Sequence, residues 1–127
     1  MRMSSIERPE FFSAAWWDAV ADAWNASSYT ASMARFGTSV FRVSDVPTQP
    51  VWVHWDDAGR ATRRQSGRFD DPAFSASRQI WLAFFEGRFT AGTGVLRLKI
   101  RFRGPVRRVL PYTGGFNNFA RAARPLV

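Results

Sequence analysis

Acid–base chemistry in this chain would have to involve His54, the only histidine, and Asp56, two positions further along. Residues two apart point from the same face of a strand, so the two side chains could form a weak acid–base dyad. No Ser, Cys or second His stands at the spacing that a nucleophilic or acid–base motif needs. We therefore expect His54 to be an ordinary strand residue, and we expect no catalytic residue.

The paired carboxylates do not follow the pattern of a metal or nucleotide site. Asp56-Asp57 and Asp70-Asp71 are each followed closely by Gly or Pro, which is typical of turns. Metal sites combine such pairs with further oxygen ligands at fixed spacing. No glycine-rich phosphate loop is present, and the absence of cysteine removes disulfides and thiolate ligands. We expect neither a metal nor a cofactor.

Positive charge is concentrated in the last third of the chain. Residues 1–87 carry a net charge of −1, whereas residues 88–127 carry +9 and no acidic side chain. An anionic partner would suit this end of the chain, and so would a plain solvated basic face.

The most distinctive basic group lies within residues 95–103, where apolar and basic residues alternate as in an amphipathic strand. Its basic side chains are Arg97, Lys99, Arg101 and Arg103. We rank a solvated face first and an anionic membrane surface or ligand head group second. Nucleic acid ranks third and is not expected, because the aromatic residues would lie on the opposite face of the strand from the charges.

The remaining pattern predicts an α+β fold in one domain spanning residues 1–127. A helix beginning at Pro9 carries apolar residues at every fourth position, and Asp18 and Asp22 fall on its opposite face. The apolar repeat is Phe12, Trp16, Val20 and Trp24. A second short helix would end at Phe36. Further helices are predicted over 78–86, 106–112 and 116–124, and strands over 38–46, 51–55, 61–66, 73–77 and 95–103. No apolar run is long enough to span a membrane, and residues 1–10 lack the apolar core of a signal peptide, so we expect a cytoplasmic protein.

The second half of the chain resembles the sterol-carrier-protein (type two) lipid-transfer family. The resemblance is carried by the stretch FSASRQIWLAFFEGRFTAGTGVLRLKIRFRGPVRRVL, which runs from Phe74 to Leu110. Its matching features are Trp81 in a helix, Gly87 after it, a small-residue segment over 91–94, and a Leu98–Ile100 strand before Gly104. Two departures stand out: Pro105 occupies a position that is usually acidic, and the last strand would be longer than usual.

The resemblance implies a five-stranded, mostly antiparallel sheet covered by helices, with an apolar tunnel between sheet and helices. It also implies a lipid-like ligand, such as a fatty acid, acyl-CoA, sterol or isoprenoid. It does not imply catalysis, because members serve as carriers or as modules attached to enzymes. The wall residues that it implies are Trp81, Phe84, Phe85, Phe89, Leu96, Leu98, Ile100, Phe102, Val109, Leu110, Phe116 and Phe119.

We therefore expect a lipid-binding or lipid-transfer protein that makes transient contact with anionic membranes. One alternative is a small enzyme with a ketosteroid isomerase-like cone fold, in which Asp45 or Asp56 would have a raised pKa and His54 would assist. Another is an interaction module that docks on a partner through its arginine face.

Overall fold

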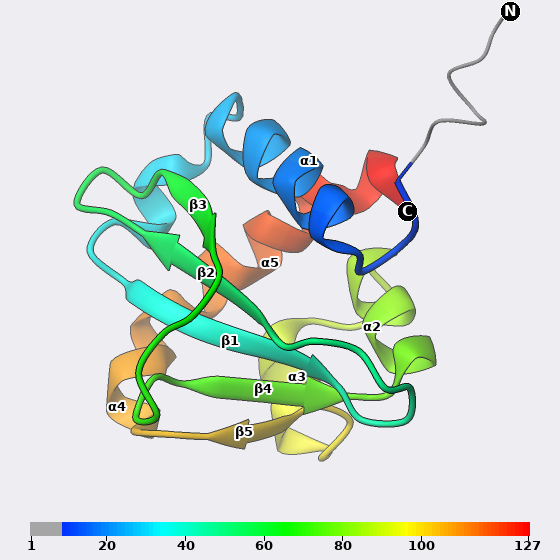
Figure 1. Cartoon of the computed structure of the whole chain (residues 1–127). Coiled ribbons are helices and arrows are strands. Elements are labelled where there is room, and N and C mark those ends of the chain that lie inside the picture. Colours follow the sequence, from blue (N-terminus) through cyan, green and yellow to red (C-terminus); the bar gives the residue numbers. More distant parts are fainter. Residues whose placement is uncertain (1–8) are drawn as a thin grey trace, which may run out of the picture.

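The computed structural model describes residues 9–127, which form a five-stranded sheet with the helices behind it (Figure 1). The strands are β1 (Gly37–Val43), β2 (Val51–Trp55), β3 (Ala61–Arg64), β4 (Ala73–Ala76) and β5 (Arg101–Arg103). The α-helices are α1 (Ala14–Asn25), α2 (Arg78–Phe85), α3 (Ala91–Leu96), α4 (Val106–Val109) and α5 (Thr113–Ala123). Short 3-10 helices are η1 (Thr30–Met33), η2 (Leu110–Tyr112) and η3 (Arg124–Leu126).

The strand order is β3-β2-β1-β4-β5, and only the β1–β4 pairing is parallel. The prediction of a mostly antiparallel α+β sheet is therefore confirmed. Phe41 lies at the centre, opposite Val51 on β2 and beside Phe74 on β4. Because alternate residues point to opposite faces, this row faces the helices and forms the floor of the core.

The core is predominantly aromatic. Trp16, Trp17 and Trp24 of α1 are fully buried. Trp17 and Trp24 pack with Trp55 of β2 around Phe119 of α5, and Trp16 packs against Phe85 of α2. Offset and edge-to-face ring pairs of this kind add to the energy of burial, by roughly 0.5–1.5 kcal/mol each. The predicted apolar stripe of the first helix is confirmed, although its pattern omitted Trp17.

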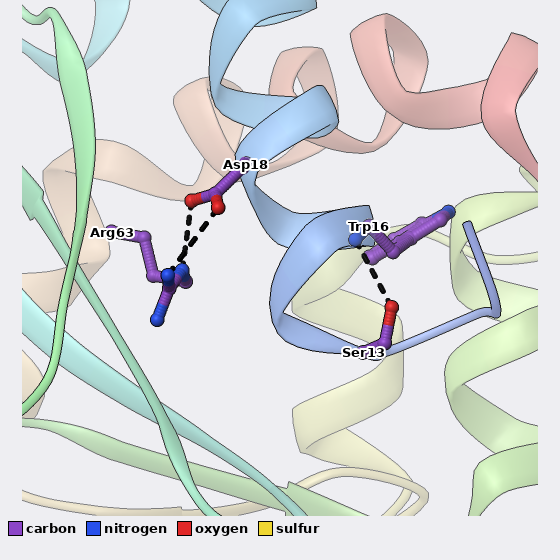
Figure 2. A network of polar contacts seen from close by, with 4 residues as sticks. All are labelled: Ser13, Trp16, Asp18 and Arg63. Atoms are coloured by element: carbon purple, nitrogen blue, oxygen red, sulfur yellow. Dashed lines mark hydrogen bonds and ion pairs between the residues drawn. The ribbon is translucent and has the colours of Figure 1, made fainter. Parts of the chain in front are cut away.

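Two polar contacts fix the position of α1 (Figure 2). The helix begins at Ala14 and not near Pro9, because the backbone at Phe12 is left-handed and the Ser13 hydroxyl accepts a hydrogen bond from the Trp16 amide at 3.1 Å. Asp18 on the exposed side accepts hydrogen bonds from Arg63 of β3, the shorter at 2.7 Å. This hydrogen bond raises the pKa of the Arg63 guanidinium.

The predicted second helix is reduced to the short 3-10 helix η1. The chain reverses at Arg35, which has a left-handed backbone, and Gly37 starts β1 with a φ of 91°. The predicted turn between β2 and β3 is confirmed: the Asp56 carboxylate accepts hydrogen bonds from the amides of Ala58 and Arg60, both at 2.9 Å.

The long strand predicted over residues 95–103 is wrong. The Thr90 hydroxyl caps α3 by accepting a hydrogen bond from the Thr93 amide, so Val95 and Leu96 are helical. The carbonyl of Gly94 then accepts hydrogen bonds from Lys99 and Ile100, which turns the chain, and β5 begins only at Arg101. The alternation of apolar and basic residues thus runs across a helix end, a turn and a short strand.

None of the helices in residues 9–127 has the length and apolar character needed to cross a bilayer. The signal-peptide expectation for the N-terminus falls mostly on residues 1–8, outside the part of the chain that the structure describes.

Candidate functional site

An apolar pocket of about 290 Å³ lies between the β4–β5 edge of the sheet and the helices α3, α4 and α5. No polar atom is exposed on its wall, and Thr113 is the only lining residue with a polar side chain. The wall consists of Phe74, Ala91, Gly92, Val95, Leu96, Phe102, Val106, Val109, Leu110, Thr113 and Phe116.

A small inner cavity of about 20 Å³ extends this pocket toward the core. Phe74, Ala91, Val95 and Phe116 line both spaces, so the two adjoin. Trp81 forms part of the inner wall, and its indole N–H donates to the Arg42 carbonyl on β1 at 2.7 Å. The inner end of the pocket is therefore held by a rigidly placed aromatic ring.

The short helix α3 covers the pocket because of its local sequence. Its first amide, on Ala91, donates to the Asn117 side chain of α5 at 2.7 Å. A side chain at Gly94 would collide with Phe89. Because glycine has no side chain, the helix can lie close to its neighbours. Gly92, in contrast, lines the pocket, and a Cβ atom there would meet nothing within 4 Å.

Larger depressions elsewhere on the surface are more open and are lined by polar residues. One of about 500 Å³ is bordered by Arg35, His54 and Asp57, and another of about 560 Å³ by Lys99 and Arg101. An apolar ligand gains little in a shallow polar depression, so the apolar pocket is the better candidate.

The structure divides the predicted wall residues into three groups. Leu96, Phe102, Val109, Leu110 and Phe116 line the pocket. Trp81, Phe84 and Ile100 line the inner cavity, together with Phe116. The remaining residues, Phe85, Phe89, Leu98 and Phe119, line neither space.

Those four residues have different surroundings. Phe85 and Phe119 are fully buried against the aromatic rings of α1. Phe89 packs on Phe84 and lies beneath the Lys99 ammonium, 5.7 Å from its ring centre. Leu98 is exposed, because the strand that was expected to turn it inward does not form.

Sequence reasoning missed Phe74, Ala91, Gly92, Val95, Val106 and Thr113 as pocket residues. Val95 follows Gly92 by three positions and Ala91 by four, the spacings that place side chains on one side of a helix. The Thr90 cap was the available signal for that helix, and the stronger period-two pattern beyond it obscured this signal.

The four predicted basic residues are all exposed, and none forms an ion pair within residues 9–127. Arg101 and Arg103 are on the edge strand β5, and Arg97 ends α3. Arg103 donates to the Phe69 carbonyl at 3.2 Å. The sequence analysis expected these residues to share one strand face, and they do not. Lys99 and Arg101 line the separate polar depression beside β4, and none of the four lines the apolar pocket.

His54 and Asp56 do not form the arrangement that acid–base catalysis would need. The His54 Nδ1 atom is hydrogen-bonded to the Thr38 hydroxyl at 2.8 Å. Burial and the nearby Arg64 charge lower the pKa of His54. Hydrogen bonds from the Arg60 and Ala58 amides lower the pKa of the exposed Asp56 carboxyl, whereas the cone-fold alternative required a raised one.

Asp45, the other carboxylate considered for that alternative, is also exposed. Its side chain accepts a hydrogen bond from the Arg78 amide at 3.0 Å, which ties the loop after β1 to the start of α2. The contact gives Asp45 a structural role at the first turn of α2, away from the apolar pocket.

The arrangement of sheet and helices is that of sterol carrier protein 2 and not that of the cone fold. This confirms the five-stranded sheet and the helices predicted from the resemblance, whereas the tunnel stays a prediction. A crystal structure of sterol carrier protein 2 is 21% identical, covers 91% of this chain and 98% of its own, and has a TM-score of 0.73. A conserved hypothetical protein from Thermus thermophilus, described as possibly a sterol carrier protein, is 18% identical, with a TM-score of 0.72. The alignment covers 93% of this chain and 90% of that one.

A third similar structure is the ubiquinone synthesis protein UbiJ-SCP2, which is 10% identical and has a TM-score of 0.60. It covers 86% of this chain and 93% of its own length. No protein-family profile matches the sequence, and none of the curated proteins is similar to it.

Proposed function

We propose that this protein binds a lipid-like ligand in the apolar pocket beneath α3 and acts as a carrier, not as an enzyme. The observation that carries the proposal is the wall of the pocket, which exposes no polar atom although one end is open to solvent. Water gains no hydrogen bonds there, whereas each buried methylene of a ligand gains about 0.8 kcal/mol. The names of the structural neighbours agree with a lipid ligand.

The size of the pocket favours a flexible alkyl or isoprenoid chain. A volume of about 290 Å³ corresponds to roughly ten water-sized groups, at about 30 Å³ each. Methylene groups are of similar size, so one chain of about ten carbons would fill the pocket. A sterol ring system would need the wall to move, and a polar head group would remain at the open end.

A single substitution can block the pocket without disturbing the core. Gly92→Phe places a ring on the face of α3 that lines the pocket, where a Cβ atom has free space. Gly114→Phe is the matched control, because a Cβ at that exposed glycine of α5 also meets nothing and Gly114 does not line the pocket. We expect Gly92→Phe to weaken binding of a fluorescent fatty acid at least about tenfold. Losing the burial of about two methylene groups of the ligand already lowers the affinity by this factor.

Titration of the fatty acid probe into the wild-type protein and both variants measures this effect, and urea unfolding verifies that all three are folded. Equal affinity of the three proteins would overturn the assignment of the pocket. Native mass spectrometry of the purified protein then identifies a ligand that co-purifies with it.

A further inference from the structure

The depression of about 560 Å³ differs in chemistry from the apolar pocket. It lies where β4 leads into α2, and we call it the basic depression. Its polar wall consists of Ser44, Ser75, Ser77, Lys99 and Arg101. None of the described residues that line it is acidic, and none of them lines the apolar pocket or the inner cavity. The basic depression is therefore a separate candidate site, with hydrogen-bond donors and positive charge.

The register of the sheet places an arginine on each side of Ser75. Ser75 of β4 is paired with Arg42 of β1 and with Arg101 of β5. Paired residues point to the same face of a sheet, and here it is the face away from the helices, because Phe74 points toward them (Figure 1). Neighbouring strands are about 4.8 Å apart, so the two arginines start roughly 10 Å apart. Both guanidinium groups can reach a ligand held above the Ser75 hydroxyl.

The protein itself does not use these donors. Arg42 and Arg101 are exposed, and neither forms an ion pair or donates a side-chain hydrogen bond within residues 9–127. The Lys99 ammonium contacts only the face of the Phe89 ring, 5.7 Å from its centre. Cations held close together repel one another, so an anion bound between them lowers the energy of all three.

The start of α2 borders the basic depression but does not supply the donors. The Arg78 amide donates to the Asp45 carboxylate at 3.0 Å, and the Ile80 amide donates to the Ser77 hydroxyl at 3.2 Å. Both amides are thus already occupied. Asp45 is held against the helix and does not line the basic depression. The side chains, and not the end of the helix, define the site.

One side of the basic depression is apolar. Leu98 and Ile80 line it, and Leu98 is 78% exposed. The backbone of Leu98 has a φ of 57°, in the left-handed region that leucine rarely adopts. Its side chain gains little burial in the folded chain, so an organic group beside it would supply a contact that the protein lacks. The volume also exceeds what a phosphate ion alone would fill.

We propose that the basic depression binds a soluble phosphomonoester. The guanidinium groups of Arg42 and Arg101 donate to the phosphate oxygens, as does the Ser75 hydroxyl, while the organic part lies on the apolar side. A phosphate has three terminal oxygens and nearly two negative charges at pH 7, which suits several donors and cations at once. A carboxylate has two oxygens and one charge. This site is independent of the proposed lipid function.

The test is a titration with phenyl phosphate, followed by the ¹H–¹⁵N NMR spectrum of the protein. We expect saturable shifts of the amides of Ser75, Lys99 and Arg101. Arg42→Ser and Arg101→Ser should each weaken binding about fivefold, since each removes one exposed ion pair with the ligand. Arg107→Ser is the matched control, because it removes an exposed arginine that does not line the basic depression. The same spectra verify that every variant is folded.

Support requires saturable shifts at these amides, weaker binding by both variants and wild-type affinity in the control. The proposal is overturned if the shifts do not saturate, or if the control loses as much affinity as the variants. Equal affinity for phenyl sulfate, which has one negative charge, would overturn the assignment to phosphate. Equal affinity for inorganic phosphate would overturn the contact with an organic group. Binding of phosphatidic acid vesicles but not of phenyl phosphate would overturn a soluble ligand.

Two crossed measurements separate this site from the apolar pocket. Arg101 does not line the pocket, so Arg101→Ser should bind the fluorescent fatty acid as wild type does. Gly92 does not line the basic depression, so Gly92→Phe should bind phenyl phosphate as wild type does. If wild type binds phenyl phosphate but no fatty acid, the proposed function fails while this site stands. Competition between the two probes would overturn the independence of the sites.

Discussion

Two serine hydroxyls show how the same group can act in opposite ways on stability. Ser39 lies in the central strand β1, is fully buried, and has no hydrogen-bond partner for its hydroxyl within the described residues. Ser77 precedes α2, and its hydroxyl accepts a hydrogen bond from the Ile80 amide at 3.2 Å. The first hydroxyl is desolvated without compensation, and the second satisfies a helix amide that would otherwise lack a partner.

We expect Ser39→Ala and Ser77→Ala to shift the free energy of unfolding in opposite directions. Removing the unpaired hydroxyl should raise it by about 1 kcal/mol, because the desolvation cost disappears. Removing the cap should lower it by about 1 kcal/mol. Urea unfolding of both variants measures the two shifts, and a loss of stability in Ser39→Ala would reveal a hydrogen bond for this hydroxyl.

At the scale of elements, the packing of α5 depends on one of two adjacent glycines. A Cβ at Gly115 would collide with the Met33 sulfur and would lie 2.6 Å from the Ser32 carbonyl oxygen. The backbone of α5 therefore approaches η1 as closely as it can. Gly114, one position earlier, faces open space.

We expect Gly115→Ala to lower the free energy of unfolding by about 1–3 kcal/mol, because η1 must move to make room. Gly114→Ala should raise it by up to about 1 kcal/mol, since alanine favours the helix. Thermal and urea unfolding of the two variants measure the contrast. Equal effects would mean that η1 yields easily and does not fix the position of α5.

The elements that sequence analysis predicted are those with strong local signals. Ser77 and the apolar residues after it predicted α2, and the alternation over residues 51–55 predicted β2. The helix α3 was missed because apolar and basic residues alternate strictly over residues 96–103, and a pattern cannot show that the Gly94 carbonyl bends the chain. An apolar ligand-binding space was predicted from the resemblance. Its lining residues on α3 were not predicted, because the helix that carries them was not predicted.

For the whole molecule, the size of the pocket sets the ligand that fits it. We expect affinity for saturated fatty acids to rise about fourfold per methylene, as each buried group adds about 0.8 kcal/mol. The rise should stop near ten carbons, when the pocket of about 290 Å³ is filled. Isothermal titration calorimetry of a chain-length series measures both the slope and the point at which it levels off.

A slope that continues unchanged to hexadecanoate would show that the wall opens and that the inner cavity beside Trp81 expands. The Gly92→Phe variant provides the internal check, because a partly filled pocket should level off at a shorter chain. The resemblance predicted a lipid ligand of any kind, whereas the volume could be obtained only from the packing of α3 against Phe74 and Phe116.

The contact between α1 and α5 has a consequence for the time course of synthesis. Trp17 and Trp24 of α1 bury their rings against Phe119, and the Trp16 indole donates to the Leu126 carbonyl at 2.9 Å. Nearly ninety residues separate the end of α1 from the start of α5. At translation rates of about 5–20 residues per second, the aromatic face of α1 stays exposed for roughly 5–20 s before α5 is synthesised and can pack against it. During that interval the nascent chain exposes an apolar tryptophan surface that is prone to aggregation. We therefore expect the yield in the cell to depend on chaperones that cover this surface until α5 has been synthesised.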